Sequence, residues 1–440
     1  MKVYPQTSDN EYSNKTASEK NGVRVYLDYA ATGPVKQEVF DEILPFFKGD
    51  FGNPSSMHEW GRSARIAVDR ARTQLEKFLN LREGRVIFTS GGTEADNLAI
   101  KGLVLPFLNK NEQKPHIITS TFEHHAVLNT CKALEKNGVE VTYIKPDKDG
   151  LILVSAIEKA IKKNTVLVTI MYVNNEIGTI APIREIGQMI EKENENRKLN
   201  KESKVYFHTD AVQAAEYLNM DVDYLHVDLL TISGHKIGAP KGVGALYIRK
   251  GVPVLPIITG GEQEFNLRAG TENVAGTVAL GKAVELIQKS EFKIDDLKNL
   301  RDYFIDRVLT EIPETQLNGS KDFRSPNNIS IYFKYVEGES ILMNLDLVGI
   351  AASSGSACTS LSLQPSHVIM AVYADAERAH GSIRFTLGQA TTKEEIDYTI
   401  ENLKNIIKKL RAMSPLAPKK YKVQSASKVT IVIIPCALNL

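Results

Sequence analysis

The sequence predicts an α/β protein in which a large domain contains a mostly parallel, seven-stranded sheet and a smaller α+β domain follows. In the first two thirds of the chain, short apolar runs alternate with amphipathic helical segments, a pattern typical of parallel sheets covered by helices. After about residue 290 the pattern changes to strands with alternating polarity, such as 328–333, mixed with helices, which indicates an antiparallel sheet. Polar clusters follow several of the apolar runs, and ligands in α/β sheets bind beyond the carboxyl ends of strands.

Composition excludes several classes of function. The chain has 440 residues with 54 basic and 53 acidic side chains, a net charge of +1, so bulk charge predicts neither nucleic-acid nor membrane binding. No apolar run is long enough to cross a bilayer. The three cysteines, Cys131, Cys358 and Cys436, are few and lack metal-site spacing. They predict no resident metal and a reducing compartment, which we take as the cytoplasm, with a mitochondrial or mitosomal matrix as the alternative.

We divide the chain into five parts. Residues 1–22 are rich in Ser, Asn and Lys, lack an apolar signal core and are interpreted as a flexible arm. Residues 23–35 form a strand that joins the small domain. Residues 36–290 make the large domain, residues 291–414 the small domain and residues 415–440 a tail.

Each predicted element follows from a local pattern. The expected strands of the large domain are buried apolar runs, at 86–89, 116–119, 139–144, 165–170, 205–210, 229–232 and 245–248. Amphipathic periodicity predicts the helices, at 61–80, 183–194, 274–290, 293–312 and 394–413. In the small domain we expect 328–333 to be a half-buried antiparallel strand, with further strands at 349–352 and 383–387.

The first candidate site lies between the strand at 86–89 and the next helix. Ser90-Gly91-Gly92-Thr93 connects them. Free backbone N–H groups, the positive end of the helix dipole and the Thr93 hydroxyl favour a bound phosphate, held by Gly92 and Thr93. The alternative is a glycine-rich tight turn.

The second candidate site is Ser233-Gly234-His235-Lys236, at the end of the strand 229–232. A partly desolvated lysine beside other cationic groups has a lowered pKa and becomes a nucleophile towards carbonyls. The hydroxyl of Ser233 and the imidazole of His235 suit a phosphate. Together they suggest a Schiff base between Lys236 and pyridoxal 5'-phosphate (PLP), whereas the alternative is a surface turn with an ordinary solvated lysine.

Further polar residues follow other strands: His124, Asn175, Asp210 and Gln213. A carboxylate at Asp210 would keep a pyridine nitrogen protonated, and the His124 imidazole could stack on the ring and exchange protons. Singly, each has a simpler explanation as a helix cap, a core histidine or a solvated acid. Because these residues converge on one edge of the sheet, we predict a shared cofactor site.

The small domain contributes two more candidates. Cys358 lies in a stretch of small residues, 353–362, where we expect a loop and a nucleophilic thiol. Arg384 lies between apolar residues of a strand and could bind a carboxylate, with a structural salt bridge as the alternative. Cys131 lies in an apolar segment, 127–134, and is interpreted as a core residue.

Ten motifs in one order give the sequence a family resemblance. They are LDYAAT (27–32), FGNPSS (51–56), TSGGTEADN (89–97), EHHAV (123–127), NNEIG (174–178), HTDAVQ (208–213), SGHK (233–236), RAGTEN (268–273), SSGSACTS (353–360) and SIRFTLG (382–388). From about residue 26 to about residue 413 the chain resembles the PLP-dependent cysteine desulfurases. The SGSACTS stretch resembles the branch that serves iron–sulfur cluster assembly.

The resemblance implies a fold-type I homodimer that converts L-cysteine to L-alanine. Cys358 would take the sulfur as a persulfide. It would then pass the sulfur to an iron–sulfur scaffold protein or to another acceptor, such as one that serves tRNA thiolation. Cys358 could also ligate an iron–sulfur cluster transiently. Lys236, Cys358 and His124 would be catalytic, and Asn175 and Arg384 would hold the substrate carboxylate. The residues implied to bind PLP are Gly92, Thr93, His124, Asn175, Asp210, Gln213, Ser233, His235 and Lys236, with Thr271 reaching in from the other subunit.

Two alternatives remain open at this point. The first is a selenocysteine lyase or another PLP-dependent β-lyase, and the second is an inactive sulfur-assembly subunit. The chain also departs from the family pattern at 263–267, which lacks the usual Arg-Gly, and after Ser414, where the tail does not resemble the family C-terminus. The departure at 263–267 does not touch the predicted chemistry, whereas the departure in the tail bears on delivery of sulfur to the usual scaffold protein.

Overall fold

The computed structural model describes residues 23–108, 114–355 and 364–421. The predicted N-terminal arm, the candidate nucleophile Cys358 and the third cysteine, Cys436, lie outside the described residues. Of the predicted tail, the described part ends with the short 3-10 turn η4 (Lys419–Tyr421).

Within the described residues, the main sheet has seven strands in the order β2-β8-β7-β6-β5-β3-β4. Five of them, β3 to β7, run parallel, and β8 is antiparallel to both of its neighbours. The strands are β2 (Arg85–Thr89), β3 (His116–Ser120), β4 (Glu140–Ile144), β5 (Thr165–Thr169), β6 (Tyr206–Asp210), β7 (Leu229–Ser233) and β8 (Gly244–Ile248). The sheet confirms the predicted mostly parallel, seven-stranded α/β fold.

Both faces of this sheet are covered by helices, as the apolar character of its strands requires. In β2, Val86 and Phe88 pack into one core and Ile87 into the other, as the two-residue period of a strand dictates. One core lies under α4 (Gly92–Leu108) and α5 (His125–Lys136), where Cys131 is a buried free thiol, as predicted. The helices of the other face are α1 (Gln37–Ile43), α3 (Glu59–Phe78), α6 (Val154–Ala160), α7 (Ile183–Leu199) and α9 (Val274–Lys289).

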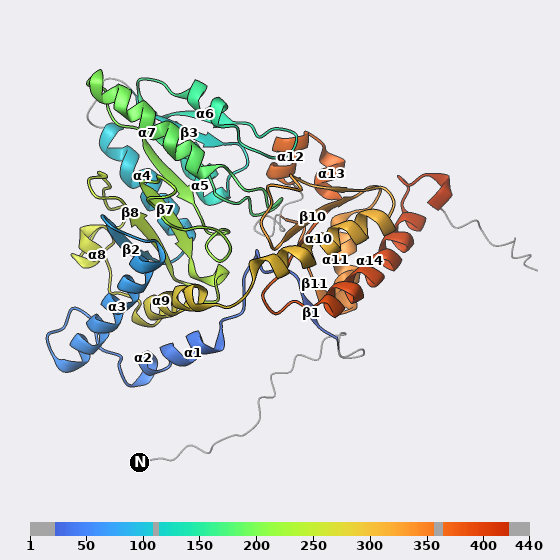
Figure 1. Cartoon of the computed structure of the whole chain (residues 1–440), viewed down its shortest axis with the longest axis horizontal. Helices are drawn as coiled ribbons and strands as arrows, with labels where there is room; N and C mark the ends of the chain where they lie inside the picture. Colours follow the sequence, from blue (N-terminus) through green and yellow to red (C-terminus); the bar gives the residue numbers. More distant parts are fainter. Residues whose placement is uncertain (1–22, 109–113, 356–363, 422–440) are drawn as a thin grey trace, which may run out of the picture.

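A second, smaller sheet has its own core. It has the order β12-β10-β9 and is antiparallel, while β1 pairs in parallel with β11 nearby. Figure 1 shows α10, α11 and α14 gathered beside these strands, at a distance from α3 and α4. The elements are β1 (Val25–Tyr26), β9 (Thr315–Leu317), β10 (Asn328–Phe333), β11 (Ile350–Ala351), β12 (Ser382–Thr386), α10 (Ile294–Glu311), α11 (Gly338–Leu347), α12 (His367–Tyr373), α13 (Ala376–His380) and α14 (Lys393–Met413). None of the described helices is both long and apolar enough to span a membrane.

The prediction that residues 328–333 form a half-buried strand is wrong. β10 is the central strand of the small sheet, and all six of its residues are buried. The alternation arises because Ile329, Ile331 and Phe333 face the apolar core, whereas the polar residues find partners on the other face. There Ser330 accepts a hydrogen bond from the side-chain amide of Asn318.

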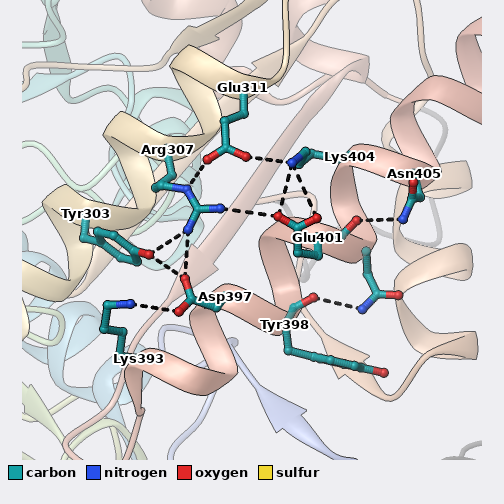
Figure 2. A network of polar contacts seen from close by, with 10 residues as sticks. Tyr303, Arg307, Glu311, Lys393, Asp397, Tyr398, Glu401, Lys404 and Asn405 are labelled. Carbon is teal, nitrogen blue, oxygen red and sulfur yellow. Dashed lines mark hydrogen bonds and ion pairs between the residues drawn. The ribbon is translucent and has the colours of Figure 1, made fainter.

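An exposed ionic network joins α10 to α14 (Figure 2). The Arg307 guanidinium binds Glu311 within its own helix and reaches Asp397 and Glu401 on α14. Lys404 returns from α14 to Glu311, with Nζ 2.8 Å from a carboxylate oxygen. The network connects the polar outer faces of α10 and α14, and the apolar faces of these two helices cover the small sheet.

A left-handed turn occupies the segment at 263–267 that departs from the family pattern. The short helix α8 (Gln263–Asn266) is interrupted there, because Glu264, Phe265 and Asn266 have φ of 46°, 59° and 65°. Residues other than glycine adopt this region at a cost in free energy. The Glu264 side chain is buried and binds the Arg72 guanidinium through two hydrogen bonds of 2.7 and 2.9 Å, which hold the turn in place.

Candidate active site

A cavity of about 310 Å³ opens at the carboxyl ends of the parallel strands. It brings together most of the side chains predicted from the sequence: Gly92, Thr93, His124, Asn175, Asp210, Gln213, Ser233, His235, Lys236 and Arg384. Thr271 is exposed and does not line the cavity of its own chain. Cys358 lies outside the described residues, but Gly355, three positions earlier, lines the cavity.

The start of α4 forms one wall. β2 ends at Thr89 and the helix begins at Gly92, so the N–H groups of its first turn lack intrahelical acceptors and face an anion favourably. A Cβ on Gly92 would come within 2.9 Å of a Val212 methyl carbon. Glycine is therefore needed for the close approach of this helix to the loop after β6.

Lys236 enters the cavity from η2 (Gly234–Lys236), the 3-10 turn that directly follows β7. Its ammonium donates hydrogen bonds to the carbonyl oxygens of Ala30 and Ala31, at 2.5 and 2.7 Å. These carbonyls come from the segment after β1, so residues 206 and 205 positions earlier in the chain hold the amine at the cavity wall.

Asp210 is the last residue of β6 and lines the cavity. Burial raises the pKa of its carboxyl to about 6, opposed by the hydrogen bond from the Val212 N–H and by the positive charge of Lys236. Gln213, one turn later, donates from Nε2 to the Ala30 carbonyl at 3.0 Å. At neutral pH, Asp210 therefore presents an anion, which suits a protonated ring nitrogen.

His124 caps the start of α5, and its Nδ1 accepts the Ala126 N–H at 3.2 Å. Burial, and then the charge of Lys236, lower its pKa to about 4. The imidazole is therefore neutral at pH 7, and because Nδ1 accepts, its proton is assigned to Nε2. His235 is also neutral, since burial and Lys236 lower its pKa to about 4.

Arg384 and Asn175 lie at the side of the cavity that faces the small sheet. The Arg384 guanidinium forms an ion pair with Asp28 at 2.9 Å and donates to the Asn175 backbone carbonyl at 2.7 Å. The structural salt bridge considered from the sequence therefore exists. Nε of Arg384 and Oδ1 of Asn175 are nevertheless buried and without a hydrogen-bond partner among the described residues, as expected where a polar ligand completes the site.

Sequence reasoning missed four further polar residues of the cavity wall: Asp96, His125, Glu176 and His367. Asp96 could have been found, because it follows Gly92 by four residues on one helix and so shares its face. Glu176 accepts a hydrogen bond from the Ser366 hydroxyl at 2.5 Å. The ring centroids of His125 and His367 lie 4.5 Å apart, a contact that no sequence pattern indicates.

Comparison with known proteins gives the family. Residues 25–399 match the family model described as aminotransferase class-V. The chain is 51% identical to the cysteine desulfurase IscS of Dictyoglomus turgidum, over 92% of this chain and 99% of that protein. It is 49% identical to the cysteine desulfurase IscS of Methanosarcina thermophila, over 90% and 95% of the two chains.

Solved structures agree with these relatives. A NifS-like protein superposes with a TM-score of 0.80 at 33% identity, covering 88% of this chain and all of that one. A structure of SspA in complex with cysteine superposes with a TM-score of 0.72 at 35% identity, over 84% and 100% of the two chains. The chain therefore belongs to the aminotransferase class-V family and, within it, to the cysteine desulfurases.

Proposed function

We propose that this protein removes the sulfur of L-cysteine, releases L-alanine and passes the sulfur from Cys358 to acceptors that build iron–sulfur clusters or thiolate tRNA. The observation that carries the proposal is the cavity that holds Lys236, Asp210 and His124, which follow the parallel strands β7, β6 and β3 of one sheet. The names of the relatives and the cysteine-bound structural neighbour support the same reaction. We place the reaction in the cytoplasm, in line with the reducing compartment that the small number of cysteines predicts.

The residues of the cavity fit PLP as the cofactor. The α4 start with Gly92 and Thr93 offers N–H groups to the phosphate, and the Asp210 carboxylate offers an anion to the ring nitrogen. Ser233 and His235 line the same cavity beside them. Oδ1 of Asn175 and Nε of Arg384 in the cavity wall are buried without a hydrogen-bond partner among the described residues, which supports binding of a polar ligand there. When bound, PLP supplies an electron-withdrawing ring that stabilises negative charge on the substrate Cα.

The chain's own side chains divide the remaining work. Lys236 would hold the cofactor aldehyde, and its amine would serve as the general base that takes the proton from the substrate Cα. Asp210 would keep the ring nitrogen protonated, and neutral His124 carries a proton on Nε2 that it could give to the substrate. Arg384 and Asn175 orient the substrate carboxylate, for which Nε of Arg384 offers a donor.

Cys358 can reach this chemistry because of its position in the chain. Gly355 lines the cavity, and three residues span at most about 11 Å whatever their conformation. The Cys358 thiolate attacks the sulfur of the bound cysteine, so that an S–S bond forms and the Cβ–S bond breaks. The electron pair of the broken bond remains on the substrate carbon, which is protonated to give alanine.

The substitution Cys358→Ser tests the nucleophile. We expect alanine formation to be lost while PLP remains bound, because the serine hydroxyl cannot accept sulfur. Cys436→Ser is the matched control and should keep full turnover. Alanine and sulfide are measured after incubation with cysteine, and alanine and selenide after incubation with selenocysteine. Undiminished turnover of cysteine by Cys358→Ser would show that Cys358 is not the nucleophile. If the unsubstituted protein turned over selenocysteine but not cysteine, the substrate would be selenocysteine instead.

We also propose that the enzyme is a homodimer in which Thr271 completes the cavity of the partner subunit. Large apolar side chains are exposed around α1 to α3, including Phe47, Phe51 and Trp60, which are 65%, 67% and 54% exposed. Exposed large apolar side chains grouped in one stretch of the chain are typical of a surface that another protein covers. Sedimentation should give a species of twice 48.8 kDa, and Phe47→Asp should yield monomers with weakened PLP binding. A fully active monomer would refute this assembly.

A further inference from the structure

Asp96 is a carboxyl that the proposed reaction does not use, although it lies in the same cavity. It is 1% exposed and lies on α4, one turn after Gly92. Oxygen and nitrogen atoms of Asp96, Asp210 and His124 all lie within 4.8 Å of one another. Oδ1 of Asp96 has no hydrogen-bond partner among the described residues. A buried, unpartnered oxygen beside the ring-facing acid is costly unless it has a role there.

The charged and titratable groups around Asp96 come from three elements. The segment before α5 contributes Glu123 and His124, β6 contributes His208 and Asp210, and η2 contributes His235 and Lys236. Burial raises the pKa of Glu123 to about 8 and lowers that of His208 to about 3. The charge of Lys236 acts on His124, His235 and Asp210, where it lowers each pKa.

His208 does not neutralise Asp96, although its Nε2 lies 3.6 Å from Oδ1. The two imidazole nitrogens are already engaged by the hydroxyls of Thr169 and Thr231, at 2.8 and 3.1 Å. Two buried carboxylates this close cannot both ionise without a large penalty. Burial, and then the charge of Asp210, raise the pKa of Asp96 well above its ordinary value, opposed by the Thr231 hydroxyl, so of the two carboxyls Asp96 is the one that favours its protonated form.

We propose that Asp96 is a positioning residue whose neutral carboxyl donates a hydrogen bond to Asp210, directly or through one water molecule, and so holds Asp210 as the anion that faces the cofactor ring. The Val212 N–H already binds one oxygen of Asp210, and Asp96 supports the carboxylate from the helix side. The inference rests on the proposed PLP site and adds a second acid to it.

The expected effect follows from the sign of the interaction. A hydrogen bond donated to a carboxylate stabilises the charged form and lowers its pKa. Removing the donor therefore raises the pKa of Asp210 above 6. Since neutral Asp210 cannot pair with a protonated ring nitrogen, affinity for the ring is present above this pKa and is lost as pH falls through it. Without Asp96 the loss occurs at a higher pH.

The test compares Asp96→Leu, which removes the donor, with Asp96→Asn, which restores an N–H donor of similar shape. Asn97→Leu is the matched control, because Asn97 lies on the same helix and binds Thr130 rather than lining the cavity. The probe is 4-deoxypyridoxine 5'-phosphate, which carries the ring and phosphate but forms no Schiff base. Its Kd for each full-length protein is measured from pH 5 to pH 8, and PLP binding to the unsubstituted protein is followed by absorption.

We expect the acid midpoint of affinity to rise by about one pH unit in Asp96→Leu, which corresponds to a tenfold weaker Kd below the midpoint. Asp96→Asn and Asn97→Leu should match the unsubstituted protein. An unmoved midpoint in Asp96→Leu, or equal shifts in Asp96→Leu and Asp96→Asn, would overturn the inference. Failure of the unsubstituted protein to bind PLP would instead overturn the proposed function.

Discussion

Two polar clusters in this molecule shift their charges in opposite directions. In the cavity and directly beside it, burial dominates: it raises the pKa of Glu123 to about 8 and that of Asp210 to about 6, and it lowers the pKa of His124 to about 4. On the exposed α10–α14 face, pairing dominates: Arg307 and Lys404 lower the pKa of Glu311 to about 2. One cluster favours neutral side chains and the other favours charged ones.

The opposite pKa shifts reflect two different uses of polar residues, one for stability and one for proton transfer. The α10–α14 network places each charge beside an opposite one in high dielectric, where individual pairs contribute little but cost little. The cavity instead keeps ionisable groups under-solvated and close to neutrality, which costs stability and allows protons to move near neutral pH. The direction of the pKa shifts, rather than the number of charges, distinguishes the active site from the stabilising surface.

The largest expected effect comes from removing the cavity's amine. Lys236→Ala should lower turnover by at least about 10²–10⁴-fold, because both the cofactor anchor and the general base are lost. The visible absorption band of bound PLP should change in the same variant. Lys241→Ala, at an exposed position five residues later, should keep both. An unchanged absorption band in Lys236→Ala would show that another amine holds the cofactor.

A smaller effect should separate the clusters by the pH dependence of stability. Glu123 has a raised pKa in the folded state. Its contribution to the free energy of unfolding is therefore fully present below pH 4.5, the ordinary pKa of the carboxyl, and is lost as pH rises to about 8. Glu123→Gln cannot ionise, so its free energy of unfolding relative to the unsubstituted protein should improve by up to about 1.4 kcal/mol per pH unit in this window. Urea unfolding at pH 5 and pH 8 measures the change.

Glu311→Gln is the control for that measurement. The pKa of Glu311 is lowered, so its favourable contribution is complete above pH 4.5 and is lost as pH falls through about 2. The difference between Glu311→Gln and the unsubstituted protein should therefore stay constant from pH 5 to pH 8. Equal pH slopes for the two variants would contradict the contrast between the clusters.

The smallest expected effect is on the α10–α14 face. Arg307→Ala should cost about 0.2–1 kcal/mol of unfolding free energy and less at high salt, because exposed ion pairs are screened. Lys298→Ala, an exposed change on the same helix, provides the baseline. Unfolding in 0.05 and 1 M salt measures both. A loss that is large and independent of salt would mean that the network behaves as a buried one.

The parts of the fold that could be predicted from sequence are those with local signals. A run such as 229–232 is apolar on both faces, so the strand β7 and its burial follow from composition. The antiparallel direction of β8 could not be predicted, because an apolar run of 245–248 carries no sign of its direction. The half-buried assignment of 328–333 was wrong for a related reason: alternation shows that two faces differ, not that one faces water.

The same limit explains the candidate site. Strand-end residues such as Asp210 and Lys236 were predictable because the carboxyl ends of parallel strands share one edge. His367 was not, since it reaches the cavity only through the packing of α12 against the start of α5. Asp96 belongs to the TSGGTEADN motif at 89–97. It could not be singled out there, because a phosphate site at Gly92 and Thr93 already accounts for the motif.

The left-handed turn at residues 264–266 packs beside β2, the edge strand of the large sheet, and its conformation depends on the buried ion pair between Arg72 and Glu264. Three consecutive residues there would relax to ordinary backbone angles if the Arg72–Glu264 contact were lost. Asn266 has a φ of 65°, and asparagine is among the residues other than glycine that tolerate this conformation best. Hydrogen exchange at the Phe88 amide, which donates to Glu264, should therefore report the first local opening of the molecule.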